Sequence, residues 1–535
     1  MKKLYIISSL ALAGFMTSCY DLDTQPMSNT ITEEQREDII KKDPEAISAI
    51  SDGVYANYNG FEMCYGDLLD FGYPAIMLQL DSRTSDFLSA NANLYGWFSE
   101  CAEYLDNTAA GVYSLIRWRL PYNIIYTANQ VLGSVEEDTE DNLLKYYRGQ
   151  AYGNRAFAYW FLAQLFQFNY VGHQNDMCVP IITEKNMEEV ANDGAPRASV
   201  QDVYDLILSD LNEGIELMTG NPAAVRSDKR YIDLNVLYGL RARTYLCMQD
   251  YTHAAEDALK VINSGAFTPL SSSAAIGPGF IDLNSANWIW GIYMAEEDVH
   301  GLYTLAGMMG SFTYGYAYVG MWKCITDTLF NKIDNSDPRK LWWISPSGNS
   351  NAQYYTSADT NAVAYLEESG FPAYAVTKFA AYNNVMGQSM NQAEYPLMRI
   401  EEMYYILAEA QAMGGDIATG KETLEKFVNG YRWLDKSNAY VCNATSPSEF
   451  IDEIFFQREV EFWGEGLTYF DIMRLNKDVN RRGTNWTDPT YGMTNYAYYI
   501  PAGSDVLLTQ IPQSEIDNNK QLTDADQNNP GTATL

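Results

Sequence analysis

Hydrophobic residues recur at helical spacing along most of the chain and predict a mainly helical protein. Helices are expected at about residues 44–57, 112–135, 141–167, 199–218 and 325–333. The 141–167 segment is the most regular, with an apolar stripe made of Leu144, Tyr147, Ala151, Ala158, Phe161, Leu162 and Leu165. Ser199 is the expected N-cap of the helix that reaches Met218. Between residues 61 and 105 regular periodicity weakens, which predicts irregular structure there.

Two segments, 234–265 and 400–429, have the spacing of tetratricopeptide (TPR) repeats, which are helix pairs that stack into an array. Their small and aromatic contact positions are Ala242, Tyr245, Tyr251 and Ala254 in the first copy, and Ala408, Ile417 and Gly420 in the second. Together with two further long helix pairs they predict a solenoid of about four TPR-like units. Arrays of this kind usually bind rather than catalyse.

Residues 266–395 form a large irregular insertion between the two copies, rich in Gly, Ser, Asn and aromatic residues. An insertion in a solenoid is where a binding site is normally placed. Aromatic residues alternate from Phe312 to Tyr318 among glycines, which predicts a rigid aromatic ladder on an accessible loop. Tyr314, Tyr316 and Trp322 are therefore predicted to contact a ligand, with packing inside a hairpin as the alternative. Trp288 and Trp290 also alternate with small or aliphatic residues and predict a structural strand.

The first 18 residues have a basic start followed by an apolar run too short to span a membrane, which predicts a secretory signal. Met16-Thr17-Ser18-Cys19 resembles a bacterial lipobox, so Cys19 is the expected lipid-modified N-terminus of the mature protein. Residues 19–42 then form a polar tether. The remainder divides into N-terminal TPR-like helices with ligand-face loops, the insertion, and C-terminal TPR-like helices with a closing tail, at 43–265, 266–395 and 396–535.

The formal net charge of −34 over 535 residues argues against nucleic acid as a partner, because phosphate binding needs a basic surface. A neutral ligand fits the composition better. The chain has 41 Tyr and 11 Trp, whose flat apolar faces and polar edges suit sugar rings. Most of these residues are nevertheless expected to fill helix interfaces.

Histidine and cysteine usage gives no support to a metal or redox site. The three histidines are isolated in sequence, and the seven cysteines form no C-x-x-C motif. We therefore predict no cofactor, no metal and no catalytic residue. If Cys19 carries lipid, the other six cysteines are expected to be buried free thiols rather than a disulfide framework.

The 450–477 stretch embeds charged residues in two apolar helices that Gly464 and Gly466 separate. Such charges need partners, so they are predicted to be structural ion pairs in a helical core. Eight residues of this stretch form a recognisable pattern of spacing, and they are Arg458, Glu461, Gly464, Glu465, Gly466, Phe470, Asp471 and Arg474. They resemble the R-x-x-E-x-x-G-E-G-x-x-x-F-D-x-x-R signature of SusD/RagB proteins, the surface glycan-binding lipoproteins of Bacteroidetes that are built on TPR-like helix pairs.

Further motifs of that family occur in order along the chain. Arg148, Gly149, Arg155 and Ala156 resemble its G-E-A-x-x-x-R-A helix, although Gln150 replaces the usual acid. Val179-Pro180-Ile181, the 196–200 segment, Asp337-Pro338-Arg339 and the tail IPQSEIDNNKQLTDADQNN resemble its remaining motifs. The resemblance thus spans essentially the whole chain, and this order is more specific than any single motif.

The resemblance implies a lipid-anchored protein of the outer-membrane surface that captures oligosaccharide or polysaccharide. Relatives act as a lid on a SusC-like TonB-dependent transporter, which becomes the expected partner. It also implies by position that Asp81, Arg83 and Trp97 contact the glycan. Trp97 would stack on a sugar ring, and Arg83 with Asp81 would hydrogen-bond its hydroxyls. An Asp81–Arg83 pair that closes a loop, plugged by Trp97, is the alternative.

Two other functions compete with glycan capture. A surface glycoside hydrolase would need two carboxylates about 5–10 Å apart. Glu401 with Glu402, or Glu459 with Glu461, could be proposed from spacing, but residues one or two apart on a helix point in different directions. A surface lid for peptides or other non-glycan cargo is the second alternative, which the aromatic content disfavours without excluding.

Overall fold

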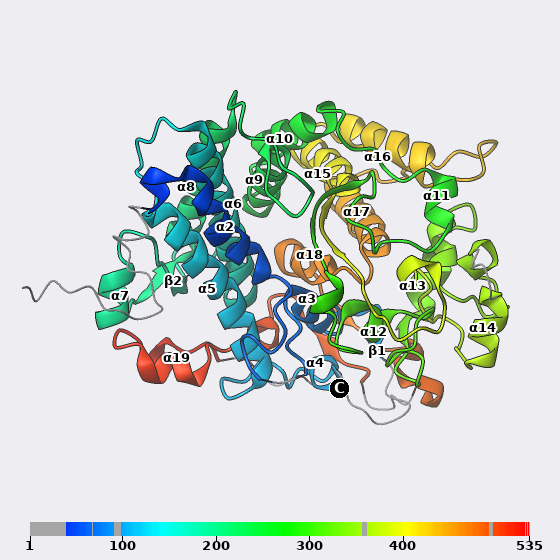
Figure 1. Cartoon of the computed structure of the whole chain (residues 1–535). Helices are drawn as coiled ribbons and strands as arrows, with labels where there is room; N and C mark the ends of the chain where they lie inside the picture. Colours follow the sequence, from blue (N-terminus) through cyan, green and yellow to red (C-terminus); the bar gives the residue numbers. More distant parts are fainter. Residues whose placement is uncertain are drawn as a thin grey trace, which may run out of the picture.

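The computed structural model describes residues 39–66, 68–89, 98–355, 361–491, 496–529, 531 and 533. Helices dominate and lie side by side in one array, and the strands are short (Figure 1). The mainly helical, TPR-like architecture predicted from the sequence is confirmed. Among the described residues, none of the helices combines the length and the apolar composition needed to cross a membrane.

The helices of the array come from both ends of the chain. The N-terminal ones are η1 (Pro44–Ala46), α2 (Ile47–Ala56), α3 (Tyr73–Asp81), α4 (Ser99–Ala102), α5 (Val112–Gly133), α6 (Asn142–Phe166), α7 (Met187–Asp193), α8 (Val200–Met218), α9 (Leu234–Met248) and α10 (Tyr251–Asn263). The C-terminal ones are α15 (Ile400–Met413), α16 (Ile417–Tyr431), α17 (Pro447–Glu461), α18 (Leu467–Leu475) and α19 (Gln513–Asn518).

The two TPR-like copies, α9/α10 and α15/α16, are distant in sequence but adjacent in space, because α10 packs directly on α15 (Figure 1). On the other side α6 packs between α5 and α8. Gly149 and Gly214 allow α6 and α8 to approach closely, since a Cβ at Gly214 would lie 3.1 Å from the Gly149 carbonyl oxygen. The array is therefore continuous across the insertion.

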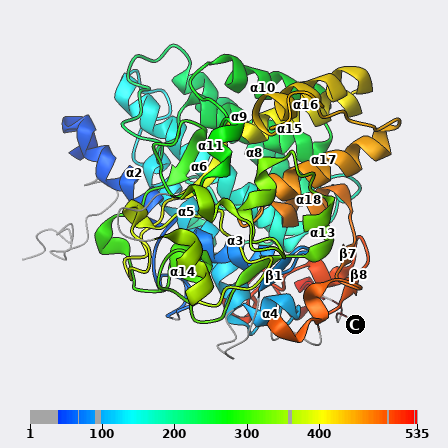
Figure 2. The ribbon, with the colours of Figure 1, turned by 90° about the vertical axis from the view of Figure 1, so that its right-hand side faces the viewer.

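The insertion contains short helices and strands joined by long loops. Its helices are α11 (Ser272–Ile276), α12 (Leu305–Met309), α13 (Asp327–Lys332) and α14 (Ala362–Glu368). The antiparallel strand pairs of the chain are β4 (Trp288–Ile292) with β6 (Tyr395–Arg399), β1 (Phe87–Ser89) with β5 (Lys323–Ile325), β2 (Met177–Pro180) with β3 (Arg197–Ser199), and β7 (Val479–Asn480) with β8 (Tyr499–Ile500). The β4–β6 pair joins the two ends of the insertion, and α11, α13 and α14 lie on the side shown in Figure 2.

Most helix predictions hold, with ends that agree to within a few residues. Ser199 caps α8 in a capping box with Asp202, as expected of an N-cap. One region differs from expectation, because the segment predicted to be irregular contains α3. The alternating segment 311–320 forms bends and turns, as expected of a loop.

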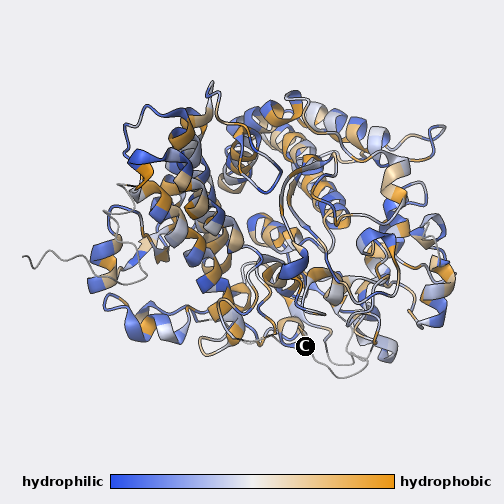
Figure 3. Ribbon diagram, in the orientation of Figure 1, coloured by the Kyte–Doolittle hydropathy of each residue, from blue (hydrophilic) through white to orange (hydrophobic). Residues whose placement is uncertain are grey.

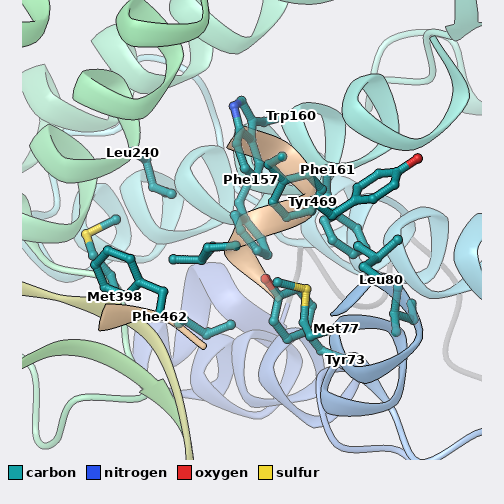
Figure 4. Packing of buried hydrophobic residues seen from close by; sticks show 14 of the residues in the cluster. Tyr73, Met77, Leu80, Phe157, Trp160, Phe161, Leu240, Met398, Phe462 and Tyr469 are labelled. Atoms are coloured by element: carbon teal, nitrogen blue, oxygen red, sulfur yellow. The ribbon is translucent and has the colours of Figure 1, made fainter. Parts of the chain in front are cut away.

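The centre of the core lies where α3, α6 and α18 meet. Phe161 of α6 contacts Tyr73 of α3 at a ring-centroid distance of 5.2 Å and Phe470 of α18 at 5.8 Å. Figure 4 shows Tyr73, Phe161 and Tyr469 around this contact, with Met77 beside Tyr73. Figure 3 shows hydrophobic and hydrophilic residues mixed along the helices. The core therefore joins N-terminal and C-terminal helices into one body.

Candidate functional site

The Gly-rich segment 310–320 folds back on α12 and carries Tyr314 at the surface. A Cβ at Gly315 would collide with the Gly307 backbone, so only glycine allows this close approach. The Tyr316 amide donates to the Gly307 carbonyl at 2.7 Å, which fixes the chain there. Gly320, at φ 103°, ends the turn in a conformation that favours glycine. The segment is thus held by its backbone, with Tyr314 exposed at its outer side.

Asn391 fixes this segment to its neighbours. Its side-chain amide donates to the carbonyls of Gly301, Tyr314 and Ser389 at 3.0, 3.2 and 3.0 Å. The Thr313 hydroxyl donates to the Asn391 amide oxygen at 2.7 Å, so both ends of the side chain are used. Asn391 is fully buried, and a buried amide with satisfied hydrogen bonds orders its surroundings.

Tyr314, Tyr318 and Tyr365 form a row of rings at the surface. Tyr314 is 43% exposed, and Tyr318 and Tyr365 are half-buried. The ring centroids of Tyr314 and Tyr318 are 5.4 Å apart, and those of Tyr318 and Tyr365 are 5.9 Å apart. We call this row the insertion face. Flat phenol rings that keep a polar edge suit the apolar face of a sugar ring.

A second group of rings continues from the inner side of the same segment. Tyr316 lies 5.9 Å from Tyr303, and Tyr303 lies 6.0 Å from Phe61, both between ring centroids. Phe61 stacks on the exposed His300 ring at 4.2 Å with an angle of 10° between their planes. Aromatic side chains from two distant parts of the chain therefore meet beside the insertion face.

A cavity of about 280 Å³ lies between α2, β4 and η2 (Glu296–Asp298). Its aromatic lining includes Tyr55, Tyr231, Trp290 and Tyr293. The Arg230 guanidinium lies over the rings of Tyr231 and Tyr293, at 5.0 and 4.5 Å from their centroids. Asp52 and Asp298 add carboxylates. The cavity thus offers both apolar walls and hydrogen-bonding groups.

The charged residues of the 450–477 stretch that match the family signature belong to buried ion pairs. Arg458 pairs with Asp471 at 2.7 Å, and Arg474 pairs with both Asp471 and Glu409. The largest group, which we call the central ion cluster, has side chains no more than 5% exposed. It consists of Arg339, Lys378, Arg399, Arg432, Asp337, Glu401, Glu461 and Glu465. The prediction that these charges are structural partners is confirmed.

Glu461 lies at the middle of the central ion cluster and contacts three arginines. Its carboxylate accepts from Arg432 at 2.7 Å, Arg399 at 2.9 Å and Arg339 at 3.2 Å. Burial alone would raise the pKa of Glu461, but the guanidiniums of Arg432 and Arg399 hold that pKa well below its usual range. Glu461 is therefore ionised and paired at neutral pH.

The carboxylates considered for hydrolysis face different partners. Glu401 belongs to the central ion cluster, and Glu402 pairs with Arg243 at 2.6 Å. Glu459 is directed away from Glu461 and lies against Asp86; burial raises the pKa of both Glu459 and Asp86. Since these groups are engaged inside the protein, they do not form a pair flanking an accessible cleft.

Cysteines and possible metal ligands add no further chemistry. Cys64, Cys101, Cys178, Cys247, Cys324 and Cys442 are buried free thiols, as predicted. Within the described part of the chain, no three His, Cys, Asp or Glu side chains gather in a way that could hold a metal ion.

Two family models match the chain, one over each half. Residues 280–531 match the SusD family, and residues 71–246 match a family described as starch-binding and associating with the outer membrane. The chain belongs to the SusD/RagB family. The resemblance that the sequence motifs indicated is therefore confirmed.

Curated SusD-like relatives cover most of the chain. Two SusD-like proteins of Formosa agariphila are each 25% identical to it, over 409 and 445 residues. The matches cover 71% and 77% of this chain, and 75% and 80% of the relatives.

Solved SusD structures share the fold. A SusD-like carbohydrate-binding protein of Bacteroides vulgatus has a TM-score of 0.72 at 23% identity, with 92% of this chain and 99% of that chain covered. Surface glycan-binding protein A of Bacteroides thetaiotaomicron, solved with laminarihexaose, has a TM-score of 0.63 at 16% identity. That match covers 90% of this chain and 99% of the other.

The positions that the SusD/RagB resemblance suggested as glycan contacts lie mostly inside the protein. Asp81 and Arg83 are 1% and 0% exposed. Asp81 accepts from the Gly466 amide at 2.9 Å, and Arg83 pairs with Asp106 at 2.9 Å rather than with Asp81. Both are placed to hold the scaffold, and this role replaces the expected ligand contact. Trp97 lies outside the described residues.

The insertion residues predicted from alternation divide between the surface and the interior. Tyr314 is exposed, whereas Tyr316 is 8% exposed and Trp322 is half-buried. Because the segment turns instead of forming a strand, alternation does not place these side chains on one face. Tyr365 was missed, since nothing in the sequence connects α14 with the 310–320 segment.

Proposed function

We propose that this SusD/RagB protein captures oligosaccharide or polysaccharide at the cell surface without cleaving it. In this proposal it delivers the glycan, as a lid, to a SusC-like TonB-dependent transporter. The observation that supports it is the insertion face, where the exposed Tyr314 ring is continued by Tyr318 and Tyr365. Surface glycan-binding protein A, which has a similar fold and was solved with laminarihexaose, supports oligosaccharide as the ligand class.

The way the insertion face is held favours binding by a preformed surface. Asn391 and the Gly315–Gly307 contact fix the backbone beneath Tyr314 before any ligand arrives. A preformed site loses less conformational entropy when it binds, so a few ring contacts can supply useful affinity. Each aromatic stacking contact contributes about 0.5–1.5 kcal/mol beyond simple burial of area.

The membrane attachment in this proposal is lipid on Cys19, followed by the 19–42 tether. Several acyl chains on one cysteine anchor a protein stably, unlike a single chain. The predicted result is a membrane-bound protein whose Cys19→Ala variant is released into the soluble fraction, and fractionation of cells expressing both forms tests it.

Glycan capture is tested by affinity electrophoresis of the mature chain, starting after Cys19, through gels that contain plant, host or microbial glycans. We expect retardation by at least one glycan and a loss of about tenfold in affinity for Tyr314→Ala. Trp97→Ala tests the position that the family resemblance suggests. Leu259→Ala, an exposed residue of α10, is the control.

Three results would change the proposal. Retardation that persists in Tyr314→Ala but is lost in Trp97→Ala would move the site from the insertion face. Release of sugar during incubation, lost in Glu459→Gln, would favour hydrolysis. An absence of retardation by every glycan would instead favour peptide cargo.

A further inference from the structure

A pocket of about 440 Å³ lies between α5, the chain that follows β2, and α19. We call it the α5 pocket. Figure 1 shows α5 and α19 at one end of the molecule and α14, which carries Tyr365 of the insertion face, at the other. The volume of the α5 pocket lies within the range of about 300–1,000 Å³ that small-molecule sites occupy.

One face of α5 supplies a row of aromatic rings to this pocket. Trp118, Tyr122 and Tyr126 are four residues apart, so they lie on the same side of the helix, about 6 Å apart along its axis. Trp118 is buried and contacts Tyr122 at a centroid distance of 4.9 Å, whereas Tyr126 is 55% exposed. The Tyr122 hydroxyl donates to the Pro180 carbonyl at 2.8 Å, which fixes its ring.

Polar side chains surround these rings and, within the part of the chain that the structure describes, keep unused hydrogen-bonding groups. Arg119 donates through Nη1 to the Cys64 carbonyl at 2.8 Å, which leaves Nε and Nη2 available. Asn123 directs Nδ2 toward the Cys64 sulfur at 3.9 Å, which leaves Oδ1 available. Glu515 accepts from Asn519 through Oε1 at 3.0 Å, which leaves Oε2 available.

This combination matches a neutral sugar in several ways. A pyranose has an apolar face for Tyr126 and a rim of hydroxyls that both donate and accept, as the guanidinium, amide and carboxylate require. One turn of α5 separates Tyr122 from Tyr126, a spacing close to the length of one sugar unit. Because Arg119 and Glu515 carry opposite charges, the pocket favours an uncharged ligand.

We infer that the α5 pocket is a second carbohydrate site, sized for one or two sugar units. It shares its ligand class with the proposed function but uses none of the residues of the insertion face. A long glycan could engage both sites, and such paired engagement raises the apparent affinity without any new contact.

The test is calorimetric titration of the mature chain with maltohexaose, cellohexaose, laminarihexaose and xylohexaose. The Tyr314→Ala variant is titrated as well, so that the insertion face contributes less. We expect the Tyr314→Ala variant to retain a binding event. Adding Tyr126→Ala to that variant is expected to weaken this residual binding at least tenfold. Tyr126→Trp preserves a flat ring and is expected to retain it, and Glu515→Gln is expected to weaken it several-fold.

The same titrations separate the two proposals. If Tyr126→Ala leaves residual binding unchanged, or if Tyr314→Ala alone removes all binding, the α5 pocket is not a sugar site. If Tyr126→Ala weakens binding and Tyr314→Ala does not, the α5 pocket stands and the insertion face fails. Binding of none of the four probes by the wild-type chain would overturn the α5 pocket. Because Tyr126 is exposed, its variants are expected to unfold at the wild-type temperature, which thermal unfolding checks.

Discussion

Replacing Glu461 with Gln changes the charge of the central ion cluster while preserving the shape of the side chain. The cluster contains four cations, Arg339, Lys378, Arg399 and Arg432, and four anions, Asp337, Glu401, Glu461 and Glu465. These charges balance in wild type, and Glu461→Gln leaves one positive charge in excess. The variant also turns an amide N–H toward guanidinium donors, where Glu461 offered an acceptor.

Breaking one partner of a buried ion pair costs about 3–5 kcal/mol, because the remaining charge stays buried without compensation. We expect Glu461→Gln to lower the free energy of unfolding by about 4 kcal/mol at neutral pH. The ionised Glu461 has a pKa below its unfolded value, so its contribution is fully present above pH about 4.3. That contribution is lost as pH falls through the folded pKa.

Urea unfolding followed by circular dichroism measures this effect, with Glu256→Gln on the exposed face of α10 as the matched control. The control is expected to change the free energy by less than about 0.5 kcal/mol. Adding Arg432→Met to Glu461→Gln restores neutrality, so the double variant is expected to lose less than the sum of the single losses. Equal stability of Glu461→Gln and wild type would refute the assignment of Glu461 as the centre of the cluster.

Three further substitutions test other parts of the structure. Asn391→Asp replaces an amide that donates to three carbonyls, so affinity electrophoresis is expected to show glycan binding weakened about tenfold with unchanged circular dichroism; unchanged binding would contradict the positioning role. Gly466→Ala would place a Cβ 2.6 Å from the Met77 Cβ at φ 75°, and a loss of at least about 2 kcal/mol in urea unfolding is expected. Gly265→Ala, at φ 65° but with open space around it, is the control and should lose only the backbone strain of about 1 kcal/mol. Burial lowers the pKa of Lys323 to about 7, and the unfolded chain keeps that proton up to pH about 10.4, so wild-type stability should rise with pH between these values. Lys323→Met should be more stable by about 3 kcal/mol at pH 8, with a difference that shrinks toward pH 10; a constant difference would show that Lys323 is not neutral in the fold.

The sequence predicted the helices in which apolar and polar residues alternate at helical spacing and missed one that is apolar almost throughout. The apolar stripe from Leu144 to Leu165 is visible because polar residues such as Asn154 and Gln164 lie between its members, although residues 148–166 of α6 are all buried. All nine residues of α3 are buried, so this helix has no solvent face and no amphipathic period. The residues of α3 are apolar almost throughout, so no stripe stands out from the rest of the helix.

The insertion face, which we propose as the ligand surface, was predicted only in part, because it depends on contacts between distant residues. Asp81 holds the Gly466 amide across 385 positions of sequence, a contact that no local pattern reveals. Tyr314 was identified from its Gly-rich setting, but its neighbour Tyr365 comes from a separate helix. Sequence spacing gives the order of side chains along a strand, and it loses this meaning where the backbone turns.

The distribution of charge explains why an acidic chain suits neutral ligands. Many of its cations lie in the interior, where Arg83, Arg117, Arg339, Arg399, Arg432 and Arg481 are among the largest fully buried side chains. Buried carboxylates, among them Asp106, Glu401 and Glu461, match these cations, so the excess negative charge lies on the outer surface. Arg119 and Arg230 are different, because each lines a pocket beside aromatic rings. A ligand at either pocket would be held by ring stacking and paired hydrogen bonds, and an uncharged glycan can make both. An anionic glycan would make the same contacts but would be repelled by the acidic surface around the pocket.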